Sequence, residues 1–166
     1  MNTIKAYTIM LIAAALGGCA TTPTTYPEAT VTTEHIKRVG GELLDAPEAI
    51  TGVKWNEKEI LFFGKTSRVP LIKEHGLGVI FDLHSSFPEV SFVDLKVTYP
   101  RMYSETKKYP GLIERKQKIE YDSTGRYVSF AYYFDEDWEL VEGIWNVTIS
   151  LDDAIIGSAE IETYHP

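Results

Sequence analysis

Apolar and polar side chains alternate with a period of two through most of the chain after residue 77. In residues 92–100, written FVDLKVTYP, one face holds Val93, Leu95, Val97 and Tyr99, while Asp94 and Lys96 lie on the other. This alternation is typical of strands in an antiparallel sheet that buries one face. The strands predicted from this pattern and from strand-favouring residues are 34–39, 59–65, 77–84, 90–99, 113–121, 127–134, 143–151 and 154–164.

Turn signals separate these segments. Gly125 lies in the short loop YDSTGRY, and the pair Asp152–Asp153 predicts a tight hairpin between the last two strands. The segment 42–49 is compatible with a short helix, but Pro47 interrupts it. Strands spaced by about ten residues predict an all-β fold, either a sandwich or a barrel.

The first residues follow a different pattern. Lys5 precedes an apolar run from Ala6 to Ala15, which is too short to cross a bilayer, where about twenty apolar residues are needed. Such a run fits the central region of a secretory signal. The residues LGGC, which end at Cys19, resemble the bacterial lipobox. That resemblance implies cleavage after Gly18 and acyl chains on Cys19, the single cysteine of the chain.

The segment after Cys19, ATTPTTYPEATVTT, is rich in threonine and proline and has no apolar periodicity. We therefore predict a signal peptide over 1–18, a lipidated cysteine and flexible tether over 19–33, and one β domain, a sandwich or a barrel, over 34–166. Several acyl chains would hold the protein durably on a membrane. Because residue 20 is alanine and not aspartate, analogy with lipoprotein sorting favours the outer membrane, with the domain facing the periplasm.

Charge and cysteine content narrow the possible partners. The chain has a net charge of −8, and removal of Lys5 with the signal makes it −9. Nucleic-acid binding needs a basic surface, so we predict none. With one cysteine there is no intrachain disulfide, and the core alone must hold the fold. A mature chain of 148 residues, counted from Cys19, is long enough for such a core.

Three stretches of the C-terminal half carry a family resemblance. Residues 67–83 (SRVPLIKEHGLGVIFDL), 97–100 (VTYP) and 134–162 (FDEDWELVEGIWNVTISLDDAIIGSAEIE) resemble a bacterial family called domain of unknown function 3859. The resemblance implies an immunoglobulin-like antiparallel β-sandwich, and it brings no catalytic residue. Within the most characteristic piece, Gly143 permits a turn, and the register of Trp145 matches an inward apolar row.

A basic segment stands out in this acidic chain. Residues 100–118 hold six basic and two acidic side chains, a net charge of +4. Their first part, 100–112, is predicted to be a long loop, and long loops are often functional. Its candidate contacts to an anionic envelope protein or glycan are Arg101, Tyr103, Lys107, Lys108 and Tyr109. A solvated loop that offsets the acidic turn is the alternative, and we favour it.

The remaining polar clusters give weaker signals. The four histidines have neither a cysteine partner nor an HExxH spacing, so no metal and no cofactor is predicted. In DLHSSF, Asp82, His84 and Ser86 lack the turn that presents a serine nucleophile. The acids of 135–142 suit a solvated turn, with calcium binding as a minor alternative.

Two hypotheses about function remain. The first is a non-catalytic binding or structural module, held on a membrane by its lipid anchor. The second is a hydrolase of envelope polymers that uses paired acids of 135–142. Assembly through an exposed sheet edge is a third idea.

Overall fold

The computed structural model describes residues 25–45, 53–104, 108–109 and 111–166. These residues are almost entirely strands, with one short 3-10 turn. In chain order the elements are β1 (Thr30–Asp45), β2 (Val53–Lys65), β3 (Arg68–Pro70), β4 (His75–Leu83), β5 (Phe92–Thr98), β6 (Met102–Tyr103), β7 (Lys108–Tyr109), β8 (Leu112–Lys118), β9 (Glu120–Tyr121), β10 (Arg126–Tyr133), η1 (Asp137–Glu139), β11 (Gly143–Leu151) and β12 (Ala154–Tyr164).

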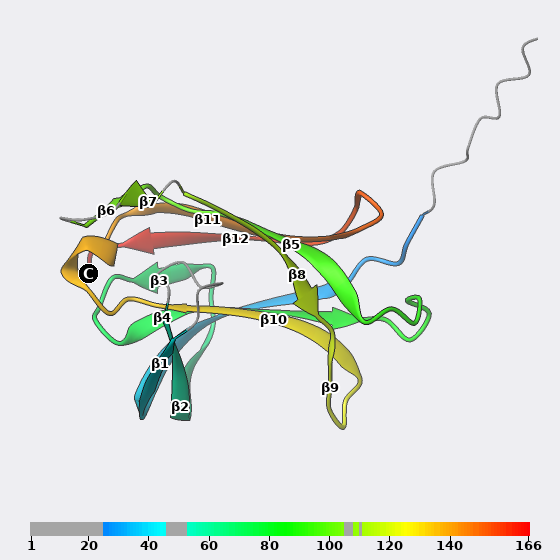
Figure 1. Cartoon of the computed structure of the whole chain (residues 1–166), viewed down its shortest axis with the longest axis horizontal. Helices are drawn as coiled ribbons and strands as arrows, with labels where there is room; N and C mark the ends of the chain where they lie inside the picture. Colours follow the sequence, from blue (N-terminus) through cyan, green and yellow to red (C-terminus); the bar gives the residue numbers. More distant parts are fainter. Residues whose placement is uncertain (1–24, 46–52, 105–107, 110) are drawn as a thin grey trace, which may run out of the picture.

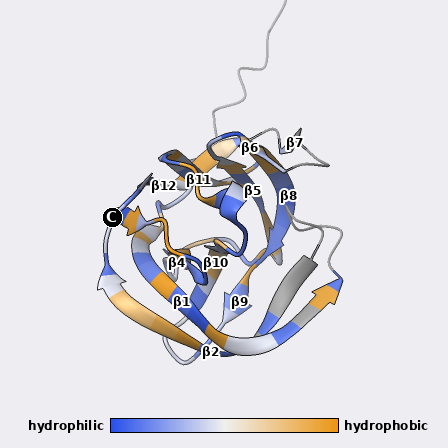
Figure 2. Cartoon of the chain, turned by 90° about the vertical axis from the view of Figure 1, so that its left-hand side faces the viewer, coloured by the Kyte–Doolittle hydropathy of each residue, from blue (hydrophilic) through white to orange (hydrophobic). Residues whose placement is uncertain are grey.

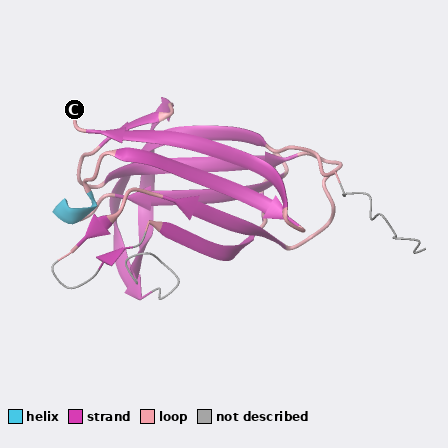
Figure 3. Cartoon of the chain, turned by 90° about the horizontal axis from the view of Figure 1, so that it is seen from above, coloured by secondary structure: helices cyan, strands magenta, loops and turns pink. Residues whose placement is uncertain are grey.

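Two five-stranded sheets pack face to face (Figure 1). The first has the order β2-β1-β4-β10-β9 and the second the order β3-β12-β11-β5-β8, while β6 and β7 form a separate pair. All neighbours are antiparallel except β12 and β3, which run parallel. Figure 3 shows the long strands of the layers, with the η1 turn at one end. The predicted all-β sandwich is confirmed.

The core lies between the sheets, where the inward rows of both layers meet. Trp145 of β11 is fully buried, as its register predicted. Its ring stacks on Tyr99 at 5.1 Å between centroids and meets the edge of Phe134 at 6.4 Å. Because large aromatic rings from both sheets meet here, this cluster holds the two layers together.

Most predicted strands are confirmed, and their bounds need adjustment. β11 and β12 have the predicted bounds. β1 begins at Thr30, so residues 30–33, assigned to the tether, belong to the sheet instead, where they pair with β4. The same strand includes residues 42–45, which the helix alternative had claimed. Pairing decides in both places, with β4 at residues 30–33 and with β2 at residues 42–45, since neither stretch has the apolar alternation that signals a strand locally.

The segment 100–112 is not the continuous loop that the sequence predicted. β6 and β7 lie within it and pair Met102 with Tyr109. Both of these side chains are buried, Met102 fully and Tyr109 with 8% exposure. Two-residue strands are too short to produce a visible alternation, so the sequence did not predict this pair.

The first sheet extends beyond the sandwich at one corner. β4 pairs with β1 only as far as Lys37, whereas β2 pairs with β1 as far as Asp45. Residues 38–45 of β1 and their β2 partners therefore form a two-stranded arm, which leaves the sandwich in Figure 1. A ribbon of two strands leaves both of its faces without a second layer.

Candidate interaction surface

The four outer strands of the two sheets differ in how their edges are protected. β3 has three residues and β9 has two, so neither offers a long edge. β8 is longer, but its residues 114–118 are all charged or polar. Short edges and charged edges both discourage pairing with another chain. β2 has 13 residues, and its charged side chains lie on either side of residues 60–63, which are all apolar.

The second half of β2 carries four consecutive apolar residues on an exposed edge. The exposed fractions are 36% for Ile60, 40% for Leu61, 60% for Phe62 and 55% for Phe63. Figure 2 shows this stretch as an orange segment at the periphery of the molecule. A continuous apolar run is typical of a strand that is buried on both faces. β2 carries such a run in an exposed edge position.

Two histidines hold Phe63 in place. His35 Nε2 and His75 Nδ1 are 2.8 Å apart and share a hydrogen bond between β1 and β4. The ring of Phe63 stacks on both imidazoles, at 4.6 Å from His35 and 5.3 Å from His75. Phe63 is also the extra residue of a β-bulge, because His35 pairs with Gly64 and Ile36 with Phe62. The cluster fixes the conformation of the apolar edge.

Both imidazoles favour the neutral form. Burial lowers the pKa of His35, and the nearby His75 lowers it further. Burial also lowers the pKa of His75, with Lys37 acting in the same direction and Glu74 against it. A neutral pair can share one N–H between two ring nitrogens, whereas two imidazolium rings can only donate. The hydrogen bond therefore depends on at least one ring staying unprotonated.

Arg38 ties the base of the arm to the sandwich. Its guanidinium donates to both carboxylate oxygens of Asp135, at 2.7 and 3.2 Å, and it lies 5.5 Å from the ring centre of Tyr133. The side chain is 7% exposed. A bidentate pair in a partly buried position restrains orientation as well as distance. No local sequence pattern predicts this contact, because 97 positions separate the two residues.

Glu139 is buried within the η1 turn. It is 1% exposed, and its carboxylate accepts from Tyr132 Oη at 2.5 Å and from the backbone N–H groups of Asp135 and Glu136 at 2.6 and 2.8 Å. Burial raises the pKa of Glu139, although these donors oppose the rise. Burial and the adjacent carboxylate also raise the pKa of Tyr132.

These contacts change the interpretation of the acidic segment 135–142. It was predicted to be a solvated turn, or else a source of catalytic acids. Of its acids, Asp137 is 85% exposed and pairs with Lys73, while Glu139 lies in the interior and Asp135 holds Arg38. Trp138 stacks on Tyr109 with centroids 4.6 Å apart. The segment closes one end of the sandwich.

The described residues among those predicted to contact an anionic partner differ in their exposure. Arg101 is exposed and Tyr103 is 56% exposed, but Tyr109 is buried against Trp138. Lys107 and the side chain of Lys108 lie outside the described residues. Farther along the basic segment, Lys116 pairs with Asp94 at 2.7 Å. Part of the local positive charge is thus neutralised by β5.

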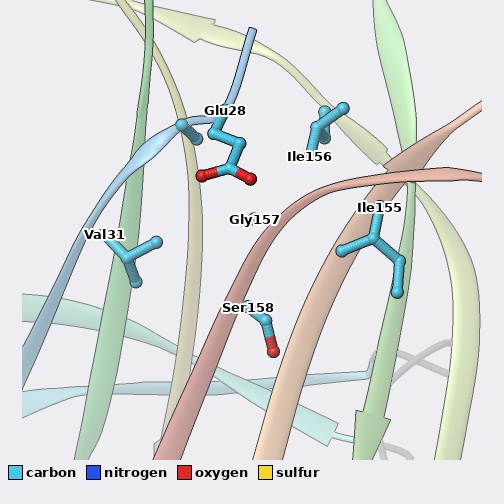
Figure 4. Close-up of a pocket in the computed structure, with 7 residues that line it drawn as sticks. Glu28, Val31, Ile155, Ile156, Gly157 and Ser158 are labelled. Carbon is cyan, nitrogen blue, oxygen red and sulfur yellow. The ribbon is translucent and has the colours of Figure 1, made fainter. Parts of the chain in front are cut away.

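A small cavity opens at the other end of the sandwich, beside the 151–154 hairpin (Figure 4). Its volume is about 260 Å³. Ligand pockets usually measure about 300–1,000 Å³, so the cavity is small for a ligand site. Its lining residues are Glu28, Ala29, Val31, Ile155, Ile156, Gly157 and Ser158.

The other polar clusters do not converge. His84 Nδ1 lies 2.8 Å from Ser86 Oγ in an exposed turn, without a described contact to Asp82. Within the described ranges, no three histidine, cysteine or carboxylate side chains gather as metal ligands would. Cys19 and the rest of the predicted signal lie before the first described residue. No helix in the part of the chain that is described is long and apolar enough to cross a membrane.

Comparison with solved structures supports the architecture. The chain is similar to an immunoglobulin-like protein from Pseudomonas aeruginosa, with 16% sequence identity and a TM-score of 0.51. The similarity covers 78% of this chain and 96% of that chain. No family model and no curated protein matches, so the resemblance to domain of unknown function 3859 stays a prediction. At this identity the structural likeness establishes the fold alone, which is an immunoglobulin-like β-sandwich.

Proposed function

We propose that this protein is a lipid-anchored, non-catalytic binding module of the cell envelope, and that β2 is its binding edge. The observation that carries the binding role is the apolar run 60–63, which lies exposed on an unprotected edge strand. Exposed edges of this kind accept an extended strand from a partner, with backbone hydrogen bonds for affinity and side chains for selectivity. The immunoglobulin-like fold is consistent with such a role.

The proposed location at the outer membrane rests on the N-terminal sequence. The apolar run before LGGC and the threonine-rich segment after it support lipidation of Cys19 and a tether to the outer membrane. The proposed tether runs from Cys19 to Tyr26, where the chain first contacts the sandwich at Asp152 and Phe87, and it gives the domain freedom to orient β2 toward a partner. The protein partner is then an envelope protein that reaches the periplasmic side.

The hydrolase hypothesis has less support. Its candidate acids included Glu139, which is buried and accepts three hydrogen bonds, and Asp135, which holds Arg38. A substrate cannot reach a side chain that is 1% exposed without unfolding the η1 turn. Catalytic carboxylates must lie in an accessible cleft, so these acids are better explained as parts of the fold.

Lipidation is tested in cells that express the full chain. Cells fed a labelled fatty acid should incorporate the label into the wild-type protein and not into Cys19→Ser. The wild-type protein should sediment with outer membranes, whereas Cys19→Ser should be released when the envelope is opened. A wild-type protein without label, found in the same fraction as Cys19→Ser, would contradict the anchor.

The binding edge is tested by photo-crosslinking. A photoreactive amino acid at Phe62 of β2 is compared with the same amino acid at Leu112 of β8, which is also an exposed apolar residue on an outer strand. We expect discrete adducts from position 62 in living cells and few from position 112. Equal adduct patterns at the two positions would remove β2 as the binding edge.

A further inference from the structure

We infer that the partner of β2 is a second copy of this chain, paired antiparallel through the β2 edges about a two-fold axis at Leu61. The inference rests on the proposed function, since it names the partner of the same edge. Within the described residues, β2 pairs with β1 alone, so its outer edge is open to another strand. Antiparallel pairing of identical edges produces a closed dimer, in which one surface patch serves both subunits.

The apolar run of β2 is complementary to itself. With the axis at Leu61, this residue lies opposite its own equivalent, and Ile60 lies opposite Phe62 of the other copy. Paired residues in an antiparallel ladder point to the same face, and apolar cross-strand pairs of this kind stabilise a sheet. The side chains of the run therefore gain apolar cross-strand neighbours on both faces of the joined sheet.

Charge also favours a second copy at this edge. The whole chain carries −8, which would oppose contact between most parts of two molecules. In contrast, β2 has three lysines and two glutamates, and β1 has two basic and three acidic side chains. The paired strands are thus neutral in total, so two copies can meet here without strong repulsion.

The shape of the first sheet leaves room for this contact. The part of β1 and β2 that passes beyond β4 leaves the sandwich (Figure 1), so a second body can approach the outer edge of β2. The β-bulge at Phe63 ends regular pairing on one side of the run. Bulges of this type terminate pairing, so the contact stays confined to the apolar residues and does not extend into a longer ladder.

Disulfide trapping tests whether the two-fold axis lies at Leu61. The experiment uses the purified full-length chain in mild detergent. Under an added thiol oxidant, Leu61→Cys should form a covalent dimer beyond the level of the parent chain with Cys19 alone. Ile60→Cys should not, because equivalent residues one position from the axis are diagonal neighbours about 7–8 Å apart. Disulfides rarely bridge Cα atoms more than about 7 Å apart.

A second measurement needs no cysteine. Sedimentation of the full-length chain in detergent should detect a dimer, and Phe62→Lys should weaken its association by at least about tenfold, equivalent to about 1.4 kcal/mol. Leu112→Lys, on the outer strand β8, is the matched control and should leave association unchanged.

The outcomes separate this inference from the proposed function. Self-association would be overturned if the wild-type chain were monomeric and Leu61→Cys formed no more covalent dimer than Leu112→Cys. In that case photo-adducts from position 62 to a different protein would leave the binding role intact. A dimer that Phe62→Lys and Leu112→Lys weaken equally would also contradict pairing through β2.

Discussion

Glu139 is a buried carboxylate, and its removal measures how strongly it holds the η1 turn. Glu139→Ala leaves the hydroxyl of Tyr132 and the N–H groups of Asp135 and Glu136 without their acceptor. A buried donor without an acceptor costs about 1–3 kcal/mol. We therefore expect the variant to lose about 3 kcal/mol of unfolding free energy in urea titrations.

Asp137→Ala is the matched control for this prediction. Asp137 belongs to the same turn, but its side chain is 85% exposed and contacts Lys73. Exposed ion pairs contribute at most about 1 kcal/mol. If both variants lost the same stability, the buried carboxylate would have no special role in the turn.

The His35–His75 pair predicts a pH dependence of stability. Both pKa values are lowered from the ordinary value of 6.5, so the unfolded chain takes up protons at a higher pH than the folded chain. The contribution of the neutral histidine pair to the unfolding free energy is complete above pH 6.5 and is lost as the pH falls below that value. The urea midpoint of the wild-type protein should therefore fall between about pH 7.5 and 5.5, around the histidine titration.

The variant His35→Gln removes one titrating ring of the pair and should flatten this pH dependence. His165→Gln changes an exposed histidine near the C-terminus and serves as the control, with the wild-type slope. Equal slopes for the wild-type protein and His35→Gln would show that other groups control stability in this range. Acidic groups contribute equally to all three proteins, so the difference between them isolates the imidazole pair.

At the scale of the elements, two glycines of β4 test how closely β4 and β10 approach. A Cβ at Gly76 would lie 2.0 Å from the carbonyl oxygen of Tyr132, whereas a Cβ at Gly78 would first meet the side chain of Ile36 at 3.3 Å. Backbone cannot move aside as a side chain can, and overpacking typically costs about 1–3 kcal/mol. Gly76→Ala should lose about 3 kcal/mol in thermal or urea unfolding.

Gly78→Ala lies on the same strand and should cost less than about 1 kcal/mol, because a small rotation of Ile36 relieves the contact. A comparable loss in the two variants would mean that the cost comes from the general effect of alanine at these positions. The close backbone approach at Gly76 would then have no part in it.

The elements also separate what the sequence predicts from what it does not. Strands β11 and β12 have their predicted bounds, because long alternating segments carry a strong local signal. β3 was missed, since its three residues hold their place through parallel pairing with the distant β12. The arm was missed in part for the same reason, because residues 40–45 and 53–58 gain strand structure from pairing and not from their own pattern.

The candidate interaction surface also combines features that a local sequence pattern predicts with features that depend on distant residues. The sequence placed Trp145 in the core and identified the apolar residues of 59–65 as a strand, both from local pattern. It did not indicate that β2 is an outer strand, which depends on the order of the whole sheet. The contacts of Arg38 with Asp135 and of His35 with His75 join residues 97 and 40 positions apart, a separation that no local pattern reports.

At the scale of the whole molecule, a sandwich usually protects its sheet edges one by one. Three of the outer strands here are short or charged, and β2 retains an apolar run. A second copy would complete the first sheet on that side and convert β2 from an edge strand into an interior strand. The stability of the fold would then depend on how many chains are present.

This dependence yields a prediction for the intact chain. If the dimer forms only between folded molecules, the melting temperature of the full-length protein in detergent should rise with its concentration. At a concentration of about one hundred times the dissociation constant, binding of this kind contributes about 2.7 kcal/mol. Phe62→Lys should show this rise only at concentrations at least about tenfold higher, while Leu112→Lys should follow the wild-type protein. A wild-type melting temperature that is constant over a hundredfold range about the dissociation constant found by sedimentation would contradict coupling between folding and association.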